Sequence, residues 1–130
     1  MKVEKQLAIF LENKPGTLAE VCTVLAKEGV NIMAVTVSDT VDHAVVRIVA
    51  SDATKALHLL GEAGVLVVES DVLVIDMVNT PGALAKVADK LSRAKVNIEY
   101  LYGSGCPGQK KGLVVIRTTN IKKAMQVLKG

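Results

Sequence analysis

Two short polar stretches of the same kind carry most of the chemistry in this sequence. Asn-Lys-Pro-Gly-Thr-Leu spans residues 13–18, and Asn-Thr-Pro-Gly-Ala-Leu spans residues 79–84. A further asparagine follows the first Asn of each stretch by eighteen residues, at Asn31 and Asn97. An asparagine amide both donates and accepts hydrogen bonds, so it suits an ammonium, a carboxylate or a polar side chain. The two stretches therefore indicate small-ligand binding.

The start of a helix beside each stretch would favour an anionic group of that ligand. Pro15 suits the first position of a helix, because its missing N–H would be unpaired there in any case. The first turn of a helix offers unpaired N–H groups and the positive end of the dipole, which suit a carboxylate. Gly16 and Gly82 carry no side chain, so a ligand can approach these donors closely.

The apolar spacing predicts a strand before each stretch and a helix after it. We expect strands at residues 7–11, 30–37, 44–49, 65–68, 72–78, 96–102 and 113–118, and helices at residues 18–28, 52–63, 83–94 and 121–128. Short apolar runs bounded by turn residues indicate strands, and apolar positions three and four apart indicate helices. The order β-α-β-β-α-β predicts an α+β, ferredoxin-like fold with helices on one face of an antiparallel sheet.

This order begins a second time, so we predict two tandem repeats, residues 1–70 and 71–130. Corresponding residues are 66 apart up to the Gly103–Gly108 loop and 68 apart beyond it, as Val46 and Val114 show. The second repeat lacks a last strand of its own. Because an open sheet edge invites pairing, we expect completion by strand exchange or by dimerisation.

These residues give the chain a resemblance to a known family. A strand, Asn-x-Pro-Gly-x-Leu, a helix, Gly-Val-Asn-Ile and a second strand resemble the ACT domain, a small regulatory module that binds amino acids. The resemblance covers nearly the whole chain twice, from Leu7 to Val37 and again from Leu73 to Leu101. Two turns in register within a β-α-β-β-α-β order are far more specific than a single Pro-Gly turn.

The resemblance implies a ligand site between paired ACT units, where the turn of one unit faces the start of the second strand of another. The implied ligand-binding residues are Asn13, Pro15, Gly16, Thr17, Leu18, Asn31, Ile32, Asn79, Gly82, Ala83, Leu84, Asn97 and Ile98. Some family members also use a His two residues before the turn Asn. Leu11 and Met77 stand there in this chain.

A plainer interpretation remains open for the asparagines. Asn is a favoured helix-capping residue, and Pro-Gly turns occur without any ligand. For Asn13 and Asn79 alone, capping and ligand binding are about equally favoured. Asn31 and Asn97 favour a ligand, because an Asn that leads an apolar strand is costly unless its amide is satisfied.

Composition excludes several other classes of protein. A net charge of +3 spread along the chain is no nucleic-acid footprint, and an aromatic content of 2% offers little for RNA bases to stack on. No apolar run approaches the roughly 20 residues that cross a bilayer. Two cysteines, Cys22 and Cys106, are too few for a disulfide framework. We expect a cytoplasmic protein without nucleic-acid or membrane partners.

We also expect neither a metal site nor a catalytic residue. His43 and His58 have no spaced partner that would complete a metal site. No carboxylate pair or nucleophile–base set stands out. The prediction is a non-catalytic, allosteric regulatory protein without a cofactor, which binds an amino acid and forms a homodimer. The alternative is a regulatory subunit of an amino-acid biosynthetic enzyme, such as the small subunit of acetolactate synthase.

Overall fold

A computed structural model describes residues 1–129 of the chain, which divides into two compact units. The first unit consists of Lys5–Ser70, and the second unit consists of Met1–Glu4 together with the chain from Asp71 onward. One boundary between the units lies between residues 70 and 71, where we also placed the boundary between the repeats. Residues 1–4, which we placed in the first repeat, belong to the second unit. Each unit has four strands and two helices.

The first unit forms around its own four strands. Its elements are β1 (Lys2–Glu12), α1 (Thr17–Lys27), β2 (Ile32–Asp39), β3 (His43–Ala50), α2 (Ala53–Glu62) and the first part of β4 (Leu66–Val78). The strand order is β2-β3-β1-β4. The pairs β1–β3 and β2–β3 are antiparallel, with Ile9 opposite Val46 in the first of them.

The core of the first unit follows from two periodicities. Along β1, Leu7 and Ile9 are completely buried and the partly exposed Ala8 lies between them. Leu25 on α1 and Leu60 on α2 close over them. Through these apolar contacts both helices pack on one face of the sheet, as in a ferredoxin-like fold.

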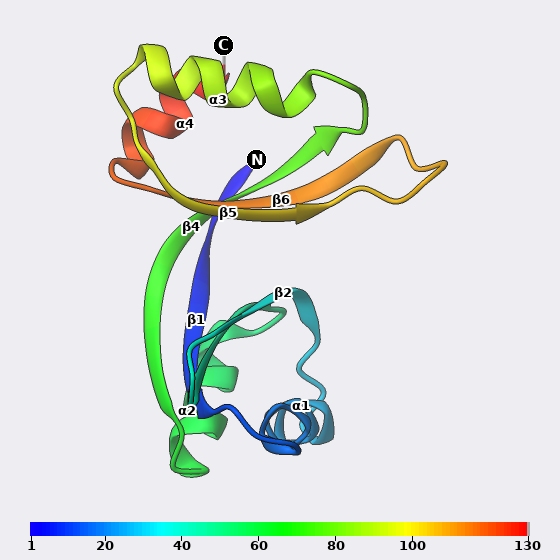
Figure 1. Cartoon of the computed structure of the whole chain (residues 1–130), viewed down its shortest axis with the longest axis vertical. Coiled ribbons are helices and arrows are strands. Elements are labelled where there is room, and N and C mark those ends of the chain that lie inside the picture. The colour runs from blue at the N-terminus through cyan, green and yellow to red at the C-terminus, as the bar shows by residue number, and fades with distance from the viewer. Residues whose placement is uncertain (130) are drawn as a thin grey trace. The chain divides into compact units, whose positions relative to one another are not determined.

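The second unit repeats this plan with a borrowed strand. Its own elements are the rest of β4, α3 (Ala83–Arg93), β5 (Ile98–Ser104), β6 (Lys111–Thr118) and α4 (Ile121–Lys129). Figure 1 shows α3 and α4 on the same side of the β5–β6 pair. The strand order is β1-β4-β6-β5, and the part of β1 that belongs to this unit is Met1–Glu4. The N-terminal residues therefore stand where the second repeat lacks a last strand.

The core of the second unit mirrors that of the first. Leu73, Leu91 and Ile116 are completely buried, and Val96 and Ala124 are buried with them. Leu73 stands 66 residues after Leu7, so the same strand position supplies the centre of both cores. The predicted ferredoxin-like α+β fold is confirmed.

The structure differs from the prediction in two local features. The strands expected at residues 65–68 and 72–78 are one continuous strand, β4, because Glu69-Ser70-Asp71 stays extended instead of turning. Pro15 is not the first helical residue. It lies in the turn, and α1 begins at Thr17 after the N-cap residue Gly16.

Candidate functional site

Both Pro-Gly turns end on a glycine that starts a helix. Gly16 and Gly82 are the N-cap residues of α1 and α3, with φ angles of 95° and 89°. These values lie in the left-handed region, which residues with a Cβ adopt only at a cost. The glycines at these two turns therefore serve backbone geometry as well as access for a ligand.

The same two helices begin without a side-chain cap. No side chain accepts from the first N–H groups of α1 or α3. In contrast, the Asp52 carboxylate accepts from the Lys55 N–H at the start of α2, at 3.0 Å. Likewise, the Asn120 amide oxygen accepts from the Lys123 N–H at the start of α4, at 3.1 Å. The helices α1 and α3 therefore lack a side-chain cap. At α3 the Ala83 N–H donates to the Thr80 carbonyl at 3.3 Å, which leaves the following N–H groups of the first turn for another acceptor.

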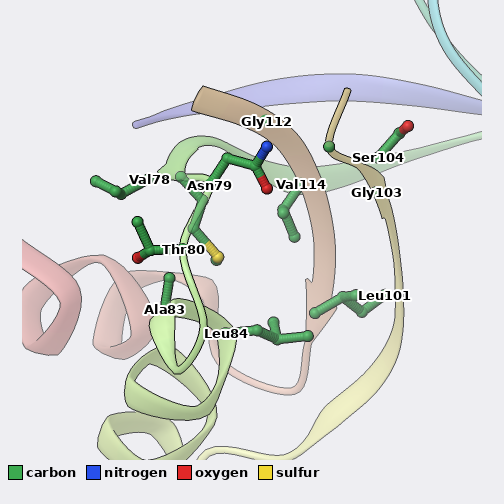
Figure 2. Close-up of a pocket in the computed structure, with 12 residues that line it drawn as sticks. Val78, Asn79, Thr80, Ala83, Leu84, Leu101, Gly103, Ser104, Gly112 and Val114 are labelled. Atoms are coloured by element: carbon green, nitrogen blue, oxygen red, sulfur yellow. The ribbon is translucent and has the colours of Figure 1, made fainter. Parts of the chain in front are cut away.

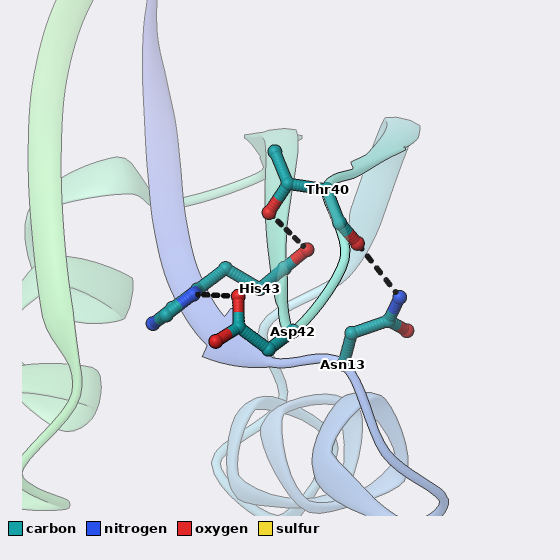
Figure 3. Close-up of polar contacts among 4 residues, drawn as sticks. All are labelled: Asn13, Thr40, Asp42 and His43. Atoms are coloured by element: carbon teal, nitrogen blue, oxygen red, sulfur yellow. Dashed lines mark hydrogen bonds and ion pairs between the residues drawn. The ribbon is translucent and has the colours of Figure 1, made fainter.

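The capping alternative for Asn13 is wrong. Its backbone N–H donates to the Asp42 carbonyl at 3.0 Å, and its side-chain amide donates to the Thr40 carbonyl at 3.3 Å. Figure 3 shows the amide turned toward the β2–β3 loop that holds both carbonyls. The Thr17 hydroxyl, which donates to the Glu12 carbonyl at 2.9 Å, ties the turn together from the other side.

Asn79 does the same in the second unit with more bonds. Its backbone N–H donates to the Lys110 carbonyl at 2.8 Å. Its side-chain NH₂ donates to the carbonyls of Cys106 and Gln109, both at 3.1 Å. Because both amide hydrogens point at carbonyls, the side-chain oxygen is the group that remains for a ligand, and it can only accept. Asn79 therefore anchors the β5–β6 loop to the turn.

A pocket of about 260 Å³ opens beside Asn79, entirely within the second unit. Figure 2 shows that the β4–α3 turn, the start of α3, the end of β5 and the start of β6 surround it. Its lining residues are Met77, Val78, Asn79, Thr80, Ala83, Leu84, Leu101, Gly103, Ser104, Gly105, Gly112 and Val114. The volume is close to the lower end of the range for small-molecule sites, roughly 300 Å³.

Three of the predicted residues line this pocket: Asn79, Ala83 and Leu84. Gly82 lies against a second, neighbouring hollow beside α3. Asn97 and Ile98 stand at the start of β5, whereas the pocket lies along the end of that strand, at Leu101–Ser104. One unit alone therefore does not bring Asn79 and Asn97 together.

The first unit separates its predicted residues in the same way. Asn13, Pro15, Gly16, Thr17 and Leu18 form the turn and the start of α1. Asn31 and Ile32 stand at the start of β2, and the β2–β3 loop bonded to Asn13 follows the end of that strand. The two groups of residues belong to opposite ends of β2.

Asn31 and Asn97 are held by their backbones. The Asn31 N–H donates to the Ser51 hydroxyl at 2.9 Å, and the Asn97 N–H donates to the Thr119 hydroxyl at 3.2 Å. Both residues are exposed, so water can satisfy their side-chain amides. The cost of an unsatisfied amide is therefore no argument for a ligand at these positions, and their assignment rests on the resemblance.

Sequence reasoning missed the glycines of the β5–β6 hairpin. Gly103 and Gly112 line the pocket, and Gly105 lies against Asn79. Aligning the two repeats would have pointed to them, because Val37 and Ala44 occupy the positions of Gly103 and Gly112 in the first repeat. A loss of side chain at a conserved strand position of a repeat indicates that something approaches the backbone there.

The remaining titratable groups form no second site in the described part of the chain. No group of three or more His, Cys, Asp or Glu side chains within residues 1–129 has metal-binding geometry. Asp42 and His43 form an exposed pair at 2.9 Å (Figure 3), and the hydrogen bond from His43 lowers the pKa of Asp42 below 3.8. Cys22 and Cys106 are both free thiols.

Fold and turns together define one duplicated unit rather than two unrelated halves. Residues 1–129 match the family described as ACT domain pair, so the chain belongs to that family. The resemblance found in the sequence is thereby confirmed. A comparison with curated proteins gives no match.

Solved structures agree with this assignment. A protein from Bacteroides thetaiotaomicron is 44% identical, with a TM-score of 0.92 over 98% of this chain and 87% of that one. The regulatory subunit of aspartate kinase from Thermus thermophilus, in a ligand-free form, is 19% identical, with a TM-score of 0.71 over 99% of this chain and 96% of that one. The regulatory subunit from Thermus flavus is 18% identical, with a TM-score of 0.64 over 99% and 92%. These last two likenesses concern the fold.

No helix among the described residues has both the length and the apolar character needed to cross a membrane.

Proposed function

We propose that this protein is a non-catalytic regulatory module that binds an amino acid or a similar small ligand at its Pro-Gly turns. The observation that carries the proposal is the contrast among helix starts. The helices α2 and α4 are capped by the side chains of Asp52 and Asn120, whereas α1 and α3 begin at a turn glycine without a side-chain cap. Membership of the ACT domain pair family supports the same function.

Uncapped N–H groups at a helix start are suited to an α-carboxylate. They point along the helix axis toward the ligand, and the dipole of the helix adds a partial positive charge. In the second unit the Asn79 side-chain oxygen lies beside the same pocket and accepts hydrogen bonds, which suits an α-ammonium. An amino acid carries both groups on one carbon atom.

The proposal includes allosteric signalling through an interface. A turn would supply one side of the site, and the Asn31 or Asn97 strand start of an ACT unit in a second copy would supply the other. A ligand that bridges them would favour one arrangement of the homodimer and shift an equilibrium that exists without it. We place this in the cytoplasm, where the free thiols Cys22 and Cys106 would stay reduced.

Calorimetric titration of the whole chain with each of the twenty amino acids tests the proposal. We expect heat of binding from a small subset of them, and a shift of the dimer equilibrium in analytical ultracentrifugation with the same ligands. Silence across the panel at about 10 mM, a concentration at which even weak binding of about −3 kcal/mol is detectable, would overturn it.

A second candidate is a regulatory subunit of an amino-acid biosynthetic enzyme. The likeness to the regulatory subunit of aspartate kinase from Thermus thermophilus, over 99% of this chain and 96% of that one, favours it. Acetolactate synthase is one enzyme with a small subunit of this kind. Co-purification of a large catalytic chain would support this candidate, and a self-contained dimer in the same experiment would count against it.

A further inference from the structure

The pocket beside Asn79 has walls without charge. Its side chains are apolar, as in Met77, Leu101 and Val114, or neutral and polar, as in Thr80 and Ser104. A charged ligand side chain would enter this pocket without an opposite charge to meet it. The loss of hydration would then oppose its binding.

The pocket exists because three positions lost side-chain atoms relative to the first repeat. Ala83 stands where the first repeat has Thr17, and Gly103 stands where it has Val37. Gly112, opposite Met77 on the sheet, stands where Ala44 is opposite Leu11. All three small residues line the pocket. With the larger side chains of the first repeat, the same arrangement has less room beside its turn.

The two strand glycines are also required by the backbone around them. A Cβ on Gly103 would lie 2.7 Å from the Leu113 carbonyl oxygen, and a Cβ on Gly112 would lie 2.6 Å from the Ser104 carbonyl oxygen. Such contacts are too short for carbon and oxygen without a shift of the backbone. The hairpin is therefore built around the missing side chains, and the pocket is a fixed feature of it.

Polar groups fix the direction in which an amino acid would enter. The N–H groups of α3 that follow Ala83 are suited to its carboxylate, and the Asn79 oxygen is suited to its ammonium. The side chain of the ligand then has the apolar walls of Leu84, Leu101 and Val114 beside it. On the basis of the function proposed above, we propose that the second unit holds the built site of each chain and takes an amino acid with a neutral aliphatic side chain.

Titration with L-leucine, L-valine, L-isoleucine and L-methionine against L-aspartate, L-lysine and L-arginine tests the ligand class. We expect the aliphatic group to bind at least about tenfold more tightly, the scale on which a hydrophobic pocket separates side chains. We also expect a stoichiometry of about one ligand per chain, since the pocket described above belongs to the second unit alone. Tighter binding of a charged amino acid would overturn this inference and leave the proposed function standing. Silence from every amino acid would overturn both.

A matched pair of variants tests the location. Ala83→Thr places the first-repeat residue in the second repeat, where Thr17 shows that the turn accepts it, and should weaken L-leucine binding about tenfold or more. Thr17→Ala makes the reciprocal change and should weaken L-leucine binding less than Ala83→Thr does. The opposite order of effects would place the site in the first repeat and overturn the inference.

A second pair of variants tests the location of the site at exposed residues, where a substitution does not disturb the core. Leu84 is 46% exposed and Leu18 is 41% exposed, so replacing either by Ser removes apolar surface from an exposed position of its helix. Leu84→Ser should weaken L-leucine binding more than Leu18→Ser does. Equal effects of the two changes would contradict a site confined to the second unit.

Discussion

The two repeats put the same Asn-x-Pro-Gly turn at the same point of the fold and then treat its surroundings differently. In the first, the Thr17 hydroxyl bonds within the turn, and Val37 and Ala44 extend the β2–β3 hairpin beside it. In the second, alanine and glycine replace these three residues, and a longer loop is bonded to Asn79. Duplication keeps the backbone geometry that a site needs, while a few side chains decide whether a pocket accompanies it.

The largest difference between the repeats is the strand that the second one borrows. Deleting residues 1–4 removes a neighbour of β4 in the second unit, so we expect that unit to lose more than about 2 kcal/mol of stability. Hydrogen exchange should report lost protection in residues 71–78 and unchanged protection in β3.

The control for this deletion is Lys2→Ala. It breaks the ion pair between Lys2 and Glu4, at 3.0 Å, but keeps the backbone of the strand. An exposed pair of this kind contributes about 1 kcal/mol or less. If Lys2→Ala had the same effect as the deletion, the ion pair and not the strand would complete the second unit.

The turn glycines should show that the repeats share their backbone energetics. Gly16→Ala and Gly82→Ala each place a Cβ in open space at a positive φ angle, so the cost comes from conformation alone, about 1–2 kcal/mol in both cases. Urea unfolding, with hydrogen exchange to assign the unit, measures both losses. A difference of more than about 1 kcal/mol would mean that one turn relaxes around its new side chain.

The turn asparagines should separate the repeats again, by a smaller amount. Asn79 donates two side-chain hydrogen bonds and Asn13 donates one, so Asn79→Ala should cost about 1–2 kcal/mol and Asn13→Ala about half of that. Thermal melting of the two variants compares them. Equal losses would show that the bonds to the β5–β6 loop add nothing beyond what the shorter loop provides.

The smallest predicted effect belongs to the first repeat alone. The hydrogen bond from His43 and then its charge hold the pKa of Asp42 below 3.8 in the folded protein. A carboxyl with a lowered folded-state pKa stabilises the protein above its ordinary pKa, and this contribution disappears as the pH falls through the folded-state value. An NMR titration of the Asp42 carboxyl should therefore have its midpoint below 3.8.

Two variants complete this measurement. His43→Ala should return the midpoint of Asp42 toward 3.8, because it removes both interactions. The corresponding residues of the second repeat are Lys110 and Lys111, so no such titration is expected in that hairpin. A midpoint unchanged by His43→Ala would assign the shift to the backbone of the loop.

Most of the fold was predictable because the periodicities were unambiguous. Leu7 and Ile9 alternate as a buried strand should, and Asp52 marks a helix start that the structure has. The continuous β4 was not predictable, because Glu69-Ser70-Asp71 is a typical turn composition and only pairing with neighbouring strands keeps it extended. The borrowed strand was not predictable, because Lys2–Glu4 is too short for its alternation to identify a strand and its neighbour β4 is distant in the sequence.

The candidate site was predictable only in part for a similar reason. Asn79, Ala83 and Leu84 belong to a motif that can be read along the chain. Leu101, Gly103 and Val114 line the pocket because β5 pairs with β6 in a register that sets Gly103 opposite Val114. Such a register cannot be seen along one strand of the sequence. The role of Asn13 could not be predicted for a different reason. An Asn at this position suits a helix cap and a hydrogen bond to a neighbouring loop equally well, so the residue type does not separate the two.

The borrowed strand also sets an order of events during synthesis. Met1–Glu4 leave the ribosome before any other residue of the second unit has been made, and their place beside β4 exists only after the chain beyond Asp71 has emerged. The first unit is one continuous segment of the chain, so it can fold before residues 1–4 have their neighbour. The contact between Met1–Glu4 and β4 therefore joins residues that are made far apart in time, so the second unit cannot close before β4 has been made.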